Sequence, residues 1–251
     1  MRIAACYKCV PNDQEITVKG DRTLDISNAQ YVLSRYDLEA VEAAMQIKGE
    51  EDQVLALTVA GDVVDNTKLR KAILSRGPQE LYAVHDGEAQ SDSLRTATIL
   101  KSAIEKIGDV ELVLCGEGSE DMYCQQVGPT LGALLGWTNV NAVSSIKRSD
   151  NGLIVERSLE NSTEVLEISL PAVISVCAGM ITPRIPSMKE ILAAGKKPVS
   201  RWEVAELSDA ANSTEVLSVL APEMADRRCE IIKGSGEDEI EAFYQLLRKA
   251  L

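Results

Sequence analysis

The sequence has few aromatic residues and a single histidine. Phe, Trp and Tyr together make up 4% of the 251 residues, and His85 follows the apolar run LYAV just before Asp86-Gly87. A histidine at this place is expected to end a strand near a turn. Because no Ser or Cys stands near it in a recognisable nucleophile setting, hydrolysis driven by a histidine base has little support.

Long apolar runs are also missing. No stretch approaches the roughly 20 apolar residues that cross a bilayer, and the start MRIAACYKCV lacks the pattern of a secretory signal. We therefore expect a cytoplasmic protein without membrane insertion. The 26 basic and 39 acidic residues give a formal net charge of −13, which would repel a polyphosphate backbone, so nucleic acid is not expected as a partner.

The six cysteines lack the spacing of a metal or redox site. Cys6 and Cys9 form a CxxC pair, but the pair lies inside an apolar, strand-like run, whereas redox pairs stand where a helix begins. A zinc site would need a second close Cys/His pair, which the sequence does not have. We predict no metal site and four or more buried thiols in a reduced protein.

Short apolar runs alternate with segments of helical period through the first half of the chain. This alternation predicts an α/β fold with a mostly parallel sheet and helices on both faces. The expected strands are Arg2–Tyr7, Val54–Val59, Leu81–Val84 and Glu111–Cys115. The expected helices are Asp37–Lys48, with Asp37 as its cap, Val64–Arg76 and Asp92–Ile107.

The pattern changes after residue 138, where three successive strands and an Asn151-Gly152 hairpin signal predict antiparallel additions to the sheet. We expect residues 1–199 to form the main domain and residues 200–251 a C-terminal extension. The expected elements are strands Val140–Lys147, Leu153–Leu159, Glu164–Leu170 and Ala172–Val176, a short helix Met188–Ala194, a polar stretch Ser200–Asn212 and a tail helix Asp238–Leu251 with an apolar stripe.

The most informative segment is LVLCGEGSEDMYCQQVGPTLGALLGW, residues 112–137. An apolar strand runs into Gly116 and Gly118, and a helix must start near Tyr123–Gln126. Unpaired N–H groups at such a helix start form an anion site suited to a phosphate. Neither a P-loop nor a GxGxxG motif is present. On the residues alone, an ordinary strand-to-helix turn explains the loop equally well.

Acidic residues in the loop and glycines in the helix that follows bear on whether this segment binds a phosphate. Carboxylates beside a phosphate must point away, cap the helix or bind sugar hydroxyls, and Asp121 is our candidate for the cap or the ribose contact. Gly128 and Gly132 would leave room for close approach of a ligand or a neighbouring strand. Each glycine costs the helix roughly 1 kcal/mol relative to alanine, so something should offset that cost.

Five ordered segments resemble the beta subunits of electron-transfer flavoproteins, particularly the FixA-like branch: CYKCVPNDQEI, SRYDLEAVEAAMQIK, TKLRKAILSRGP, GEGSEDMYCQQVGP and PAVISVCAGMITPRIPSMKEILAAGKKPV. The resemblance covers nearly the whole chain. It implies an adenine-nucleotide-binding fold and an electron carrier rather than an enzyme, active only with a FixB-like alpha subunit onto which the C-terminal extension packs. It also implies FAD held by or shared with that subunit, AMP or a second FAD in the beta pocket, and a redox partner of the acyl-CoA dehydrogenase or quinone reductase type. Some FixA-like members bifurcate electrons, and the sequence leaves this question open.

The resemblance also assigns residues. It places the nucleotide pocket at Cys6, Ser34, Arg35, Tyr36, Asp37, Val59, Gly116, Asp121, Cys124, Gln125, Gln126, Val127 and Gly128. It places the loop that docks partner dehydrogenases at residues 183–192, with Arg184, Met188 and Ile191 as contacts. The chain departs from the family where Ser34-Arg35-Tyr36 replaces Asn-Pro before an aromatic residue, and where Met122-Tyr123 replaces an acidic pair.

Two alternatives remain open at this stage. Met188 and Ile191 could cap the hydrophobic core instead of docking a partner. An adenine-nucleotide sensor or an ATP-using enzyme of the same superfamily is the alternative function, although an ATP-using enzyme would need a Ser/Gly-rich loop after the first strand, and Tyr7-Lys8-Cys9-Val10-Pro11 is not one.

Overall fold

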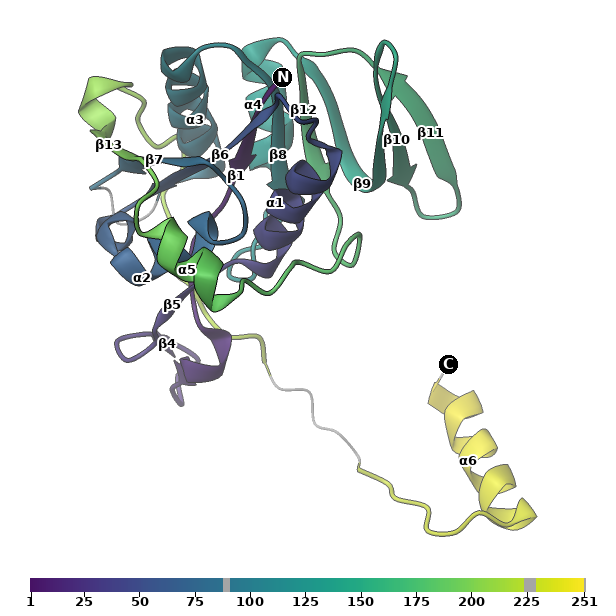
Figure 1. Ribbon diagram of the computed structural model, residues 1–251. Helices are drawn as coiled ribbons and strands as arrows, with labels where there is room; N and C mark the ends of the chain where they lie inside the picture. The colour runs from purple at the N-terminus through teal and green to yellow at the C-terminus, as the bar shows by residue number, and fades with distance from the viewer. Residues whose placement is uncertain (88–90, 224–228, 251) are drawn as a thin grey trace.

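A nine-stranded sheet forms the centre of the molecule (Figure 1), in the order β11-β10-β9-β12-β8-β1-β6-β7-β13. The computed structural model describes residues 1–87, 91–223 and 229–250. The strands from β9 to β13 in this order all run parallel, which confirms the predicted α/β class. They are β9 Thr138–Ser149, β12 Ala172–Val176, β8 Val110–Gly116, β1 Arg2–Cys6, β6 Gln53–Ala60, β7 Glu80–His85 and β13 Val199–Glu203.

The predicted antiparallel additions are confirmed at one side of the sheet. Strand β10, Gly152–Ser158, pairs antiparallel with β9, and β11, Thr163–Ile168, pairs antiparallel with β10. Gly152 pairs with Ser149, so Asp150 and Asn151 form a two-residue hairpin turn.

Helices cover both faces of the sheet (Figure 1). Helices α1 Arg35–Ile47, α2 Thr67–Leu74 and α5 Met188–Ala194 pack on one face, and α3 Ser93–Ile107 and α4 Val127–Leu135 pack on the other. In β1 the side chains alternate between these two cores, with Ile3 and Ala5 toward α1 and Ala4 and Cys6 toward α3. Burial on both faces explains why the central strands are continuously apolar.

Several elements differ from the sequence-based expectation. The predicted helix Val64–Arg76 is split into a 3₁₀ turn, Asp62–Asp65, and α2, because the Asn66 side chain accepts hydrogen bonds from the N–H groups of Lys68 and Leu69 and so starts a new helix. The predicted polar stretch Ser200–Asn212 begins with a strand, since β13 pairs with β7. The short strands β2 Cys9–Pro11, β5 Tyr31–Leu33, β3 Thr17–Val18 and β4 Leu24–Asp25 form two small sheets that the sequence did not predict.

The expectation of four or more buried cysteines is wrong. Cys6, Cys9 and Cys115 are buried, Cys177 is half-buried, and Cys124 and Cys229 are exposed, all as free thiols. Cys6 and Cys115 lie on central strands and Cys9 lies on the short strand β2, whereas the exposed two lie on a loop and in the C-terminal tail.

The C-terminal segment first crosses the body and then leaves it. Asp92, at the start of α3, accepts hydrogen bonds from the backbone N–H groups of Ser213 and Thr214, and Leu220 forms a β-bridge with Thr23. Helix α6, Glu237–Ala250, lies apart from the body in Figure 1 and exposes its apolar side chains, Phe243 among them. Residue 251 of the predicted tail helix lies outside the described residues. In the part of the chain that the structure describes, no helix has the length and apolar character needed to span a membrane.

Candidate functional site

The candidate site lies where the strand order reverses. From β1 the chain moves outward to β6 and β7 and then returns to form β8 on the other side of β1. Open parallel sheets bind ligands beyond the carboxyl ends of the strands at such a switch point. Residues 7–8 follow β1 here and residues 117–126 follow β8, so the predicted glycine loop stands at this place.

Asp37 holds the two strand ends together. Its Oδ2 accepts a hydrogen bond of 2.7 Å from the Lys8 N–H, and its Oδ1 accepts one of 3.0 Å from the Gly116 N–H. Burial raises the pKa of the Asp37 carboxyl to about 7. The prediction that Asp37 caps α1 is wrong: Ser34 occupies the cap position, and Asp37 points inward because both oxygens are held by the strand ends.

Each carboxylate of the loop already has a partner. Glu120 forms an ion pair with Arg35, and Asp121 lies 2.6 Å from the Lys8 Nζ. Glu117 accepts a 2.8 Å hydrogen bond from the Tyr123 hydroxyl. These acids therefore point toward their own partners and do not block an incoming anion.

The cap role proposed for Asp121 is also wrong. Gln126 is the N-cap residue of α4 and has no side-chain cap bond. Asp121 instead accepts hydrogen bonds from Lys8 and from the Ser119 hydroxyl. These bonds lower the pKa of Asp121 against the effect of its own burial, so it stays ionised.

Polar groups without protein partners remain at the same edge. The backbone N–H groups of Cys124, Gln125 and Gln126 donate to no described residue. Tyr123 and Gln125 have positive φ angles of 44° and 56°, and Gln126 follows in the right-handed region. Alternation of left- and right-handed residues directs successive N–H groups toward one point and forms an anion-binding concavity.

Ser34 adds a second unsatisfied group. Its hydroxyl is fully buried and has no hydrogen-bond partner among the described residues. Buried polar groups normally have partners, so an orphan at a ligand edge is the mark of a contact still to be made. The edge therefore fits a phosphate-bearing ligand.

The glycines of α4 serve packing within the protein. A Cβ atom at Gly128 would lie 2.1 Å from the Ser175 Oγ on β12 and 2.9 Å from the Cys115 Sγ on β8. At Gly132 it would lie 2.7 Å from the Asn139 Cγ on β9. Gly128 and Gly132 therefore leave room for the neighbouring strands and not for a ligand.

The predicted pocket residues all come from elements that begin or end at this edge. Ser34, Arg35, Tyr36 and Asp37 form the start of α1, and the Tyr36 ring lies 5.3 Å from the Tyr123 ring. The others come from the strand ends, from the exposed loop and from the first turn of α4: Cys6, Val59, Gly116, Asp121, Cys124, Gln125, Gln126, Val127 and Gly128. Cys6 is buried and its pKa is raised by that burial, so it contributes a neutral thiol.

The predicted docking residues form a separate surface. Arg184 donates to Glu42 in the middle of α1, with its Nε 2.7 Å from the Oε2. Met188 starts α5 and is 71% exposed, and Ile191 is also exposed. Met188 therefore does not cap the hydrophobic core.

Sequence reasoning missed Lys8, which supplies a positive side chain at the edge through its pair with Asp121. Its position directly after β1 was the available signal, because residues that follow central parallel strands face the ligand side. The partner of Asp121 comes from 113 residues away in the sequence, and no local pattern shows that contact.

A family comparison agrees with this geometry. The model of the electron transfer flavoprotein domain matches residues 22–207. The chain belongs to the electron transfer flavoprotein family. Members of this family bind flavin and carry electrons, and they are not classical enzymes. In the described ranges, no group of three or more His, Cys, Asp or Glu side chains is arranged to hold a metal ion.

Proposed function

We propose that this chain is the beta subunit of a heterodimeric electron transfer flavoprotein of the FixA-like branch, active in electron transfer only with its alpha subunit. The observation that carries the proposal is the coincidence of a family match with unpaired N–H groups at the switch point between β1 and β8. The FAD of the complex is held by or shared with the alpha subunit, and the beta edge binds AMP or a second FAD. We further propose a cytoplasmic complex.

In this proposal, the phosphate is bound by the backbone N–H groups of Cys124, Gln125 and Gln126. Backbone N–H groups suit this task because a nucleotide phosphate is an anion and the start of α4 adds the positive end of a helix dipole. We assign the Ser34 hydroxyl and the Tyr36 ring to contacts with the nucleoside, and Asp121 to contacts with the ribose hydroxyls. A bound flavin supplies the redox chemistry, while these residues bind and orient the nucleotide.

The remaining parts have separate roles. The loop at residues 183–192 docks a dehydrogenase or quinone reductase through Met188 and Ile191, and Arg184 orders its start through Glu42. Residues 200–251 form an extension whose last helix packs on the alpha subunit, in keeping with the exposed apolar side chains of α6. This division leaves the nucleotide edge and the docking loop on different parts of the surface.

The decisive experiment is to coexpress the chain with its alpha subunit, purify the heterodimer and quantify the extracted nucleotides. We expect a yellow heterodimer with one FAD plus either one AMP or a second FAD, and only the second result is compatible with bifurcation at the beta site. A lone chain that turned over a dehydrogenase substrate at enzyme-like rates would contradict the proposal, as would a colourless complex.

A charge substitution tests where the nucleotide binds. Gln125 is exposed and has a left-handed backbone, which Asp and Asn both adopt readily. Gln125→Asp places a carboxylate beside the proposed phosphate, whereas Gln125→Asn has the same shape without the charge. We expect the Asp variant to lose nucleotide about tenfold or more, since like charges in close contact disfavour binding by more than 1 kcal/mol, and the Asn variant to retain it. Equal nucleotide content in the two variants would place the site elsewhere.

A further inference from the structure

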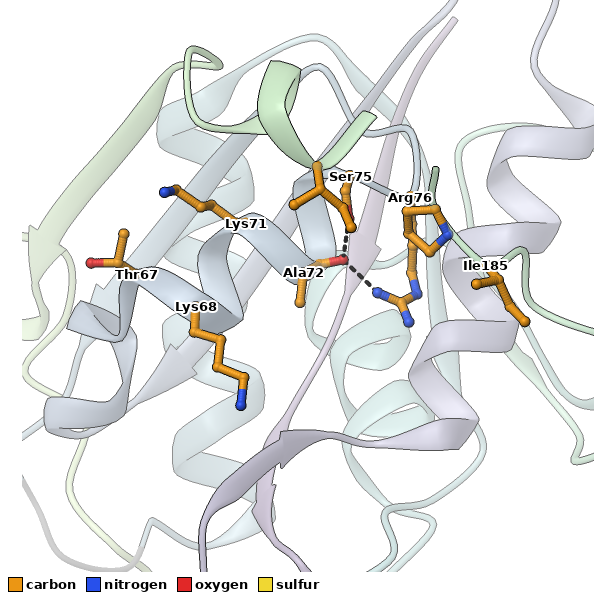
Figure 2. A pocket seen from close by; sticks show the side chains of 9 residues that line it. Thr67, Lys68, Lys71, Ala72, Ser75, Arg76 and Ile185 are labelled. Carbon is orange, nitrogen blue, oxygen red and sulfur yellow. Dashed lines mark hydrogen bonds between the residues drawn. The ribbon is translucent and has the colours of Figure 1, made fainter. Parts of the chain in front are cut away.

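A cavity of about 590 Å³ lies between α2 and the docking loop (Figure 2). Its lining comes from one face of α2, from the two residues that follow α2, from the segment that leads into α5 and from Ile191 of α5. The lining residues are Thr67, Lys68, Lys71, Ala72, Ser75, Arg76, Ile185, Pro186 and Ile191. We call this cavity the α2 groove.

Arg76 is the unusual residue of the α2 groove. Its Nη1 donates to the Ala72 carbonyl at 2.6 Å, and its buried Nε has no hydrogen-bond partner in the described part of the chain. Every other arginine from Arg2 to Arg201 forms an ion pair with a carboxylate. Arg76 forms none with any described residue, in a protein whose acidic residues outnumber its basic ones by 39 to 26.

Burial makes this lack of a partner costly. Desolvation lowers the pKa of the Arg76 guanidinium, which means that the protein environment disfavours its charge. An arginine does not release its proton in proteins, so the unfavourable energy persists until an anion approaches. Lys68 and Lys71 line the same groove and likewise have no ion pair with a described residue, although both are exposed.

The surface next to the α2 groove is apolar. Ile185 is 93% exposed and Leu192 is 72% exposed, and both belong to the segment that also carries Met188. An exposed apolar patch beside a partly desolvated arginine is typical of a protein-binding surface. A free inorganic anion would pair with Arg76 and leave these side chains in water, whereas a protein surface can cover both.

We propose that the α2 groove receives an acidic side chain of the redox partner protein, so that Arg76 selects the partner while the neighbouring apolar side chains supply contact area. The inference rests on the proposed function, because it takes the docking loop as the place where the redox partner binds. The groove and the loop are continuous, since Ile185, Pro186 and Ile191 belong to both. The occupant is thus a segment with a carboxylate next to apolar residues.

The test uses the purified heterodimer as the electron acceptor of an acyl-CoA dehydrogenase that is reduced by its acyl-CoA substrate. We expect Arg76→Gln to raise the KM for the heterodimer about tenfold without changing kcat, because a removed ion pair weakens association and leaves the chemistry intact. The rise of KM with added salt should also become shallower than in the wild type. Arg157→Gln, which removes a paired arginine on β10, is the matched control and should leave KM unchanged.

The possible outcomes distinguish a failure of the role given to Arg76 from a failure of the proposed function. An active wild-type heterodimer with an unchanged KM in Arg76→Gln overturns the inference and leaves the proposed function intact. A wild-type heterodimer that exchanges electrons neither with the dehydrogenase nor with a quinone reductase overturns both. Should Arg76→Gln fail to fold, Lys68→Gln/Lys71→Gln replaces it: a rise of KM by about threefold or more supports the inference, and an unchanged KM rejects it.

Discussion

The carboxyl edge of β1 and β8 and the α2 groove handle charge in opposite ways. At the edge, Glu120 and Asp121 are paired with Arg35 and Lys8, and the groups left open are neutral backbone N–H groups. In the groove, the cation of Arg76 is left without a carboxylate from the described residues, and apolar side chains are exposed. The edge is therefore suited to a small ligand that brings its own negative charge, and the groove to a protein surface.

The two regions also differ in how they are attached to the core. The edge depends on buried groups, since Asp37 joins two strand ends and Gly128 packs directly against β12. The docking loop is attached through the Arg184–Glu42 ion pair and through Ala194, which is buried at the end of α5, and its apolar tips project into solvent. Substitutions of the buried residues at the edge should accordingly alter folding together with binding, whereas substitutions on the loop should alter recognition alone.

The largest expected effect is that of Gly128→Val. The new side chain would collide with Ser175 and Cys115 on two central strands, so we expect the free energy of unfolding to fall by up to about 3 kcal/mol, in the range of overpacked cores. Loss of nucleotide from this variant would follow from damage to the fold and would say nothing about the phosphate. Urea denaturation measures the effect.

Gly20→Val is the matched control, because a Cβ atom at Gly20 meets nothing within 4 Å. We expect this change to alter stability by less than about 0.5 kcal/mol. If Gly128→Val were as stable as Gly20→Val, α4 could move away from β12 to make room for the side chain. The edge of β1 and β8 would then not depend on the close packing of Gly128.

The sequence predicted the elements that depend on local patterns and missed those that depend on contacts between residues far apart in the chain. The central strands, α1 and α3 were predictable because their buried side chains recur with local apolar periodicity, whereas α5 buries only Ala194. Strand β13 was missed because Ser200, Arg201 and Glu203 give it the polar composition of an edge strand, and its pairing with β7 is a long-range contact.

The candidate site was likewise predicted only where a local pattern marks it. The glycine loop was predicted because a strand, a turn and a helix start follow one another in a single segment. The docking loop was predicted because it is an extended segment flanked by prolines. The inward orientation of Asp37 and the pairing of Lys8 with Asp121 join segments far apart in the sequence. The groove at Arg76 needs the packing of α5 on α2, and no local pattern predicts it.

The second effect concerns pH and Asp37. Its pKa is about 7 in the folded protein, above the usual 3.8, because burial disfavours the carboxylate. The folded state thus binds a proton more tightly than the unfolded chain between these values. The stabilisation that comes from protonated Asp37 is fully present below about pH 4 and is lost as the pH rises to about 7. Over this range the free energy of unfolding falls by up to roughly 1.4 kcal/mol per pH unit.

Asp37→Asn removes this titration. We expect the wild type to lose stability relative to the variant from pH 5 to pH 7, and the difference between the two to become constant above pH 8. Urea denaturation at a series of pH values measures it, with the exposed Asp150→Asn as the control. A difference that does not change with pH would mean that the two backbone hydrogen bonds fully offset the effect of burial on this carboxyl.

The smallest effect on stability, and the sharpest test of the docking surface, is that of Met188→Glu. Met188 is 71% exposed at the start of α5, so a carboxylate there stays in water and the melting temperature should remain nearly unchanged. Nucleotide content should also persist, because the edge of β1 and β8 is built from other residues. Electron transfer to or from the partner should fall by roughly tenfold or more, since losing an apolar anchor weakens association by about 1–3 kcal/mol.

Val165→Glu is the matched control for this last change. Val165 is 67% exposed on β11, away from α5, so the same apolar-to-acidic substitution changes the net charge equally without touching the docking loop. Equal losses of electron transfer in both variants would mean that the added negative charge repels the partner from anywhere on the surface. A loss confined to Met188→Glu assigns the effect to the loop, and a large drop in its melting temperature would instead show that Met188 supports the fold.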